Sequence, residues 1–199
     1  MLVGLVRHGL TDWNAAGRIQ GQSDIPLNEE GRRQARLLAN RLFDEKEYHW
    51  DYVITSGLMR AEETGKIIAD KLDIPLLEPD SRIKERAFGQ VEGLTASERE
   101  TKWGKDWNLL ELGQEKEEGI RARALAFLQD LEENYGDSNV LVVTHGGLLA
   151  QLFTALYQDQ CTQRIGNLSL TVLEKSQMEW ALRLYNCTRH LEEIIEESK

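Results

Sequence analysis

The chain has 199 residues, of which 41% are hydrophobic and 29% charged, a composition typical of one folded globular domain. Its net charge of −10 disfavours nucleic acid or an anionic membrane as a partner, because both need a basic surface. Cys161 and Cys187 stand apart without clustered histidines, so we expect neither a disulfide framework nor a zinc site. The apolar N-terminal run is too short for a signal peptide or a membrane span. We therefore expect a single cytoplasmic domain over residues 1–199.

Three short apolar runs, each ending in polar residues, have the pattern of buried strands. They cover residues 2–6, 51–56 and 140–144. Arg7 and His8 follow the first run, and His145 follows the third. Because α/β sheets place ligands at the carboxyl ends of their strands, we expect these polar residues to meet at one edge of a sheet.

Segments of helical period alternate with these strands. One helix is expected after an N-cap at Asn28, a second after Ser56 and a third after His145. This alternation predicts an α/β fold of three layers, α/β/α, with a mostly parallel sheet. Alternating runs at 168–172 and 180–184 predict two further strands joined by a turn at 175–177, which makes the sheet mixed.

The region from Thr95 to Glu118 is strongly charged and lacks a clean period. We expect a helical or irregular excursion over the sheet, a candidate lid at about residues 94–118. Trp103 and Trp107, four residues apart, are more typical of a packing stripe than of a substrate wall, although an aromatic or apolar leaving group is an alternative. Residues 192–199 form an acidic tail that we expect to fray.

The segment from Leu5 to Asn14 reads LVRHGLTDWN, with Arg, His and Gly at the mouth of a buried strand where a core would require apolar residues. It resembles the signature of the histidine phosphatase superfamily, which includes the cofactor-dependent phosphoglycerate mutases. The resemblance continues in family order through residues 21–31, 55–64, 85–93 and 144–147. It implies hydrolysis of phosphomonoesters of a small phosphorylated metabolite, through a phosphohistidine and with neither metal nor cofactor.

By this resemblance, His8 is the nucleophile that attacks phosphorus, and Glu85 protonates the leaving alkoxide and later activates water. To attack, His8 must be neutral, so its other ring nitrogen should donate to a carbonyl or a carboxylate. Repulsion from the substrate phosphate favours the protonated form of Glu85. Arg7, Arg60 and His145 are implied to cradle the phosphate, and a protonated His145 would add positive charge. The resemblance also implies substrate-binding roles for Asn14, Gln20, Gly21, Gln22 and Gly146.

Plainer interpretations compete at several of these positions. Arg60 alone would be a helix-surface arginine paired with Glu62 or Glu63, and Glu85 alone would be a solvated loop residue. His49 and His190, which sit among charged residues, are interpreted as structural or solvated and are given no role. One departure from the family pattern is Gly57, where the family often has Pro or Asp, and we expect Arg60 to keep its place despite it.

Two other functions remain as alternatives. A phosphoglycerate mutase would share the His8 chemistry, but it needs extra cations for the substrate carboxylate. Ala96 occupies the place of the lysine of the mutases, the insertion is short, and Arg86 alone keeps their pattern. A non-catalytic phosphate-binding regulator is the other alternative. Family members of this size include broad-specificity, sugar-bisphosphate and α-ribazole phosphatases, so the substrate stays open, as does the oligomeric state.

Overall fold

The computed structural model describes residues 1–45, 47–176 and 179–192. Within them the chain forms a sheet of 5 strands in the order β2-β3-β1-β4-β5. The strands are β1 (Leu2–Arg7), β2 (Tyr52–Thr55), β3 (Val140–Thr144), β4 (Leu170–Lys175) and β5 (Trp180–Cys187). β1, β2 and β3 pair in parallel, whereas β4 pairs antiparallel with both β1 and β5. The mixed sheet that the sequence predicts is confirmed.

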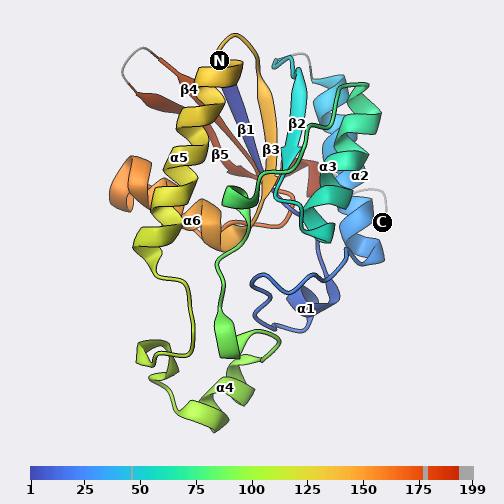
Figure 1. Ribbon diagram of the computed structural model, residues 1–199. Coiled ribbons are helices and arrows are strands. Elements are labelled where there is room, and N and C mark those ends of the chain that lie inside the picture. Colours follow the sequence, from blue (N-terminus) through green and yellow to red (C-terminus); the bar gives the residue numbers. More distant parts are fainter. Residues whose placement is uncertain (46, 177–178, 193–199) are drawn as a thin grey trace.

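Helices cover both faces of this sheet, as Figure 1 shows. The α-helices of the described residues are α1 (Asp12–Ala15), α2 (Glu29–Asp44), α3 (Met59–Leu72), α4 (Ala96–Trp103), α5 (Glu117–Tyr135) and α6 (Gly146–Tyr157). Of these, α2, α3, α5 and α6 lie against the sheet. Side chains of α5 and α6 pack with Val140 and Val142 in one core cluster, and side chains of α2 and α3 pack with Leu141 and Val143 in the other. The alternation along β3 therefore feeds two cores, which gives the three layers that the sequence predicts.

Local signals in the sequence explain where several helices begin. The side chain of Asn28 accepts a hydrogen bond from Gly31 N–H at 2.9 Å, the N-cap expected for α2. Thr95 and Glu98 form a capping box at the start of α4. α5 is a helix that our sequence analysis did not predict.

The carboxyl ends of β1 and β3 lie side by side at one edge of the sheet. Arg7 pairs with Thr144 in the parallel register, and the backbone N–H of His8 donates to Thr144 O at 2.9 Å. His145 is the N-cap of α6. In Figure 1, α1 and α4 lie beyond this edge and not across a face of the sheet. We had expected the segment that carries α4 to lie over the sheet, and the structure does not show this.

None of the helices in the described ranges combines the length and the apolar character needed to span a bilayer. The predicted turn at 175–177 begins in the described residues, where Ser176 N–H donates to Glu179 O at 2.9 Å, but Gln177 lies outside them. The expected acidic tail also lies outside the described residues, apart from Glu192.

Candidate active site

The two histidines that follow β1 and β3 share one site. The ring centroids of His8 and His145 are 5.0 Å apart, and the two residues are 3% and 0% exposed. Parallel neighbouring strands end at the same edge, so residues 137 positions apart in the sequence come together there. The expected meeting of these two segments is confirmed.

The surroundings of His8 fix its tautomer. Its Nδ1 lies 2.7 Å from Gly9 O, and because a carbonyl can only accept, Nδ1 carries the hydrogen. Burial, followed by the charges of Arg7 and Arg60, lowers the pKa of His8 well below 6.5. At neutral pH the ring is therefore neutral, and its Nε2 holds the lone pair that a nucleophile needs.

Arg7 and Arg60 bring two positive charges to the site, held by backbone carbonyls. Arg7 donates to Ile165 O at 2.7 Å, and Arg60 donates to Gly21 O at 2.6 Å and Ser23 O at 2.9 Å. Burial lowers the pKa of each arginine to about 10, which leaves both charged at neutral pH. Since carbonyls do not neutralise these cations, an anion can gain from both.

The interpretation of Arg60 as a surface arginine is wrong. Arg60 is fully buried and reaches the 20–23 segment instead of a neighbouring glutamate, while Glu63 pairs with Arg32. The turn before it contains Gly57 with φ of +79°, a left-handed conformation that proline cannot adopt. Arg60 keeps its place in the site despite this departure from the family pattern, as expected.

His145 is held by a serine that our sequence analysis did not single out. Its Nε2 lies 2.7 Å from Ser56 Oγ, and that oxygen accepts from Leu58 N–H at 3.3 Å. When the Ser56 hydroxyl donates to Nε2, the hydrogen of the neutral ring is on Nδ1. Burial lowers the pKa of His145 well below 6.5, and the nearby His8, Arg60 and Arg7 lower it further. His145 is therefore neutral in this state, without the positive charge that a protonated ring would add.

Four side chains of the site carry a buried nitrogen atom without a hydrogen-bond partner in the part of the chain that the structure describes. They are Arg7 (Nε), Gln20 (Nε2), Arg60 (Nε) and His145 (Nδ1). Buried polar atoms are nearly always hydrogen-bonded in folded proteins. A ligand with several acceptor oxygens, such as a phosphoryl group, would satisfy such atoms.

The segment around Gln20 supports Arg60 and Glu85 in different ways. Asn14 donates its amide to Gln20 Oε1 at 3.1 Å. Gly21 supplies the carbonyl that holds Arg60, and Gln22 donates its amide to Glu85 O at 3.0 Å. Direct substrate contact by Asn14, Gln20, Gly21 and Gln22 stays a prediction.

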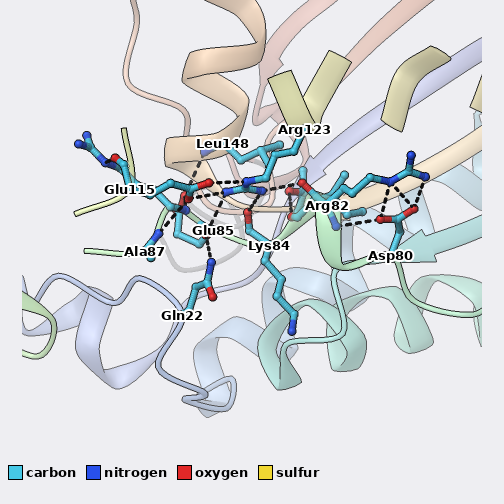
Figure 2. Close-up of polar contacts among 12 residues, drawn as sticks. Gln22, Asp80, Arg82, Lys84, Glu85, Ala87, Glu115, Arg123 and Leu148 are labelled. Carbon is cyan, nitrogen blue, oxygen red and sulfur yellow. Dashed lines mark hydrogen bonds and ion pairs between the residues drawn. The ribbon is translucent and has the colours of Figure 1, made fainter. Parts of the chain in front are cut away.

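Glu85 belongs to a loop, but its carboxylate lies against the N-terminus of α6 and is not simply solvated. Its carboxylate accepts from the N–H groups of Arg86, Gly147 and Leu148 at 2.8, 2.9 and 3.0 Å (Figure 2). A Cβ at position 147 would stand 2.6 Å from Glu85 Oε1, so this approach requires glycine. The Glu85 charge opposes the effect of burial on the pKa of both Arg7 and Arg60. Gly146 begins α6 next to Arg7: a Cβ there would stand 3.2 Å from Arg7 Nε.

The remaining residues singled out in the sequence lie in other settings. Trp103 and Trp107 are half-buried, with the side chains of Lys102 and Arg99 over their rings at 4.4 and 4.8 Å. His190 is buried 3.4 Å from Arg41, which fits the structural interpretation. His49 is 83% exposed at its side chain, which fits the solvated one.

Sequence reasoning missed a further support of the nucleophile. Asn167, in the segment before β4, donates to His8 O at 3.0 Å and contacts Asn14 Oδ1 at 3.4 Å. It lies outside every block that resembles the family, so no signal in a single sequence marks it.

Comparisons with known proteins agree with this geometry. The family model of the histidine phosphatase superfamily (branch 1) matches residues 3–188. An uncharacterized phosphatase PhoE of Bacillus subtilis is 34% identical over 96% of this chain and 97% of its own length. A metal-independent phosphoserine phosphatase of Arabidopsis thaliana is 33% identical over 96% of this chain and 83% of its own.

Two further similarities span most of the chain. A probable phosphoglycerate mutase GpmB of Yersinia pestis is 35% identical over 88% of this chain and 86% of its own. The structure of a mycobacterial glucosyl-3-phosphoglycerate phosphatase in complex with VO3 superposes with a TM-score of 0.81 at 27% identity, over 94% of this chain and 99% of that one. The family match and the phosphatase relatives identify a phosphomonoesterase. The chain belongs to the histidine phosphatase superfamily, branch 1.

Proposed function

We propose that this protein hydrolyses the phosphomonoester of a small metabolite through a phosphohistidine on His8, without a metal ion. The observation that carries the proposal is the state of His8. Its ring is held neutral with the hydrogen on Nδ1, 5.0 Å from His145 and beside two arginines that bond to carbonyls. This arrangement combines an available nucleophile with fixed positive charge for phosphate oxygens.

In the first step, Nε2 of His8 attacks phosphorus while the bond between phosphorus and the ester oxygen breaks. Arg7 and Arg60 stabilise the charge on the equatorial oxygens, and His145 donates from its unpartnered Nδ1 in the tautomer whose Nε2 accepts from the Ser56 hydroxyl. The leaving oxygen takes a proton from the carboxyl group of Glu85, so the product departs as an alcohol.

In the second step, water attacks the phosphorus of phosphohistidine and the bond between phosphorus and nitrogen breaks. The carboxylate of Glu85 accepts the proton of that water, which restores the carboxyl group. His8 regains its neutral form and inorganic phosphate leaves. Because the arginines stay charged throughout, this cycle needs no metal ion to neutralise the substrate.

The substrate class follows from charge and from the relatives. The protein is acidic overall, so we propose that a small phosphorylated metabolite, rather than a polynucleotide or a membrane lipid, reaches the localised arginines. Phosphoserine is one compound to test, since it appears in the name of a relative. The free cysteines Cys161 and Cys187 support our proposal of a reducing, cytoplasmic location.

We also propose that residues 94–118, called the lid segment below, cover the bound substrate as part of the single domain over residues 1–199. Both ends of the segment join the site loops: Ile19 N–H donates to Leu94 O at 3.1 Å, and Gln90 N–H donates to Leu112 O at 2.8 Å. Between these ends the segment is largely exposed, with Leu109 78% exposed. Such a segment is suited to move against a substrate without disturbing the sheet.

Hydrolysis of p-nitrophenyl phosphate in excess chelator tests the proposed function. We expect turnover that chelator does not reduce and that added divalent metal does not increase. Absence of turnover in the folded wild-type protein would favour the phosphate-binding regulator instead. Loss of activity on chelation, restored by metal, would contradict the metal-free mechanism.

Mutase activity is the second candidate, because a relative named as a probable phosphoglycerate mutase is 35% identical over 88% of this chain. A mutase needs extra cations for the substrate carboxylate. Here Arg86 donates its Nε to Glu115 O at 2.9 Å, and Ala96, at the place of the lysine of the mutases, begins α4. We therefore expect hydrolysis of phosphoglycerate to outpace its isomerisation, with no requirement for a bisphosphoglycerate primer. Primer-dependent isomerisation faster than hydrolysis would reverse this assignment.

A further inference from the structure

Glu85 stands on a stretch of chain without regular secondary structure. Residues 85–88 belong to neither a helix nor a strand. A proton donor must be held within a fraction of an ångström of its working position, and a loop backbone does not provide this by itself. Other contacts must therefore fix the backbone at Glu85.

Arg123 of α5 supplies three of these contacts. Its guanidinium donates to Arg82 O and Lys84 O, each at 2.6 Å, and to Glu85 O at 3.2 Å. In Figure 2 the Arg123 side chain reaches from its helix onto this loop. The side chain is only 17% exposed, so these bonds are shielded from water. The rigid guanidinium group thus binds three backbone carbonyls, two of them before Glu85 in the chain and one of Glu85 itself.

Glu115, at the end of the lid segment, holds Arg123 from the other side. Its two carboxylate oxygens accept from Arg123 Nε and Nη2 at 2.8 and 3.0 Å. The same carboxylate accepts from Ala87 N–H at 3.2 Å, and Glu115 N–H donates to Ala87 O at 2.8 Å. Burial opposes the charge of Glu115, but the bonds from Arg123 and Ala87 hold its pKa below the usual value. Glu115 is therefore ionised at neutral pH.

We propose that Arg123 and Glu115 form a clamp that positions Glu85 for proton transfer and links it to the lid segment. The clamp bonds to the backbone of residues 82–87, while the carboxylate of Glu85 bonds to the N-terminus of α6. Arg123 and Glu115 are therefore positioning residues that act through Glu85 and do not touch the reacting atoms. This inference rests on the proposed role of Glu85 as proton donor.

Arg121 offers a matched control for Arg123. It lies on the same helix and is also paired with glutamates, Glu117 at 3.8 Å and Glu118 at 3.5 Å. Both partners belong to the first turn of α5, so this ion pair lies within one helix, whereas Arg123 bonds to the backbone of another segment. Comparing Arg123→Gln with Arg121→Gln thus separates the clamp from the general loss of an ion pair on α5.

The experiment compares kcat for an alkyl phosphate, glycerol 2-phosphate, with kcat for p-nitrophenyl phosphate, whose leaving group needs little protonation. Arg123→Gln should lower the alkyl-to-aryl ratio by about 10-fold to 100-fold, the cost of a small misplacement of a catalytic group. Arg121→Gln should leave the ratio at the wild-type value. An unchanged ratio in Arg123→Gln, or an equal fall in both variants, would overturn the proposal.

The background of Glu85→Gln makes the test specific for positioning. If the clamp acts through Glu85, adding Arg123→Gln to Glu85→Gln lowers the ratio no further, and independent, multiplied effects would contradict this. Should Arg123→Gln fail to fold, Glu115→Gln removes only one charge and should shift the ratio in the same direction. Failure of the proposed function looks different, because the wild type itself would then form no phosphoenzyme from p-nitrophenyl phosphate.

Discussion

The two halves of the site are built by different means. The phosphate half comprises His8, His145 and the arginines, and it stands on the ends of β1 and β3 and on the start of α3. The proton-donor half comprises Glu85 and its clamp, and it stands on an irregular loop fixed by side chains from α5 and the lid segment. The positions of the first half are set mainly by regular secondary structure, whereas those of the second depend on a few long-range polar contacts.

This difference implies that the phosphate half is rigid and the proton-donor half is adjustable. Strand ends in a packed sheet cannot move without disrupting the core, so the groups that must meet every phosphate ester are the rigid ones. A loop held by side chains can adjust when the lid segment moves, so the proton donor can respond to the leaving group. The comparison predicts that changes in the phosphate half affect all substrates alike, whereas changes in the other half depend on the leaving group.

The largest effect is expected in the phosphate half. Arg60→Met should lower kcat/KM by about 10²-fold to 10³-fold for both alkyl and aryl phosphates, because it removes fixed positive charge from the transition state. Methionine fills much of the buried volume, so the variant should fold, which thermal unfolding checks. The exposed Arg36, paired only loosely with Glu29 at 3.7 Å, provides the control Arg36→Met with wild-type rates. A fall in kcat/KM of Arg60→Met for only one class of leaving group would contradict the proposed difference between the two halves.

A smaller and selective effect is expected for Glu85→Gln. The amide keeps the shape but cannot donate a proton to an alkoxide, so kcat for glycerol 2-phosphate should fall by about 10²-fold or more. Turnover of p-nitrophenyl phosphate should change much less, since nitrophenolate leaves without help. Steady-state kinetics on the two substrates measures this, and equal slowing of both would argue against leaving-group protonation by Glu85.

The smallest effect concerns stability and pH. Burial keeps the pKa of His145 well below its ordinary 6.5, so the unfolded chain binds a proton that the folded chain does not. Above pH 6.5 neither state binds this proton, so it does not affect the free energy of unfolding. Below pH 6.5 only the unfolded chain binds it, and the free energy of unfolding falls by about 1.4 kcal/mol per pH unit. Urea unfolding between pH 7.5 and 5.5 should therefore show a shallower decline for His145→Asn than for the wild type. His49→Asn, at an exposed position, should decline like the wild type, and parallel curves for all three would show that His145 charges freely in the folded protein.

Much of the phosphate half could be predicted from the sequence, because local patterns determine it. Apolar runs that end in Arg7-His8 and in His145 mark strand ends, and the rules of parallel sheets bring those ends together. The N-cap at Asn28 was readable for the same reason, since its side chain bonds only three residues along the chain. The role of Arg60 at the phosphate was predicted instead from the resemblance of its block to the family.

The proton-donor half could not be predicted to the same depth. Arg123 lies on α5, a helix that our sequence analysis missed although Ile120, Ala124 and Leu131 repeat at helical spacing, because the charged residues before it obscured the start. Its partners Arg82, Lys84 and Glu85 are 38 to 41 positions away, a separation that no periodicity reveals. Ser56 and Asn167 were missed for the same reason, since both act through contacts with distant residues.

The location of the phosphoryl group on the enzyme tests the central claim most directly. Wild-type protein mixed with excess p-nitrophenyl phosphate in chelator and quenched within milliseconds should carry one acid-labile phosphoryl group, which peptide mapping at alkaline pH places on His8. The His8→Ala variant should carry none and should not turn over, while His145→Asn should still be labelled at His8. A phosphoryl group on His145 or on another residue, or steady turnover by His8→Ala, would contradict the account.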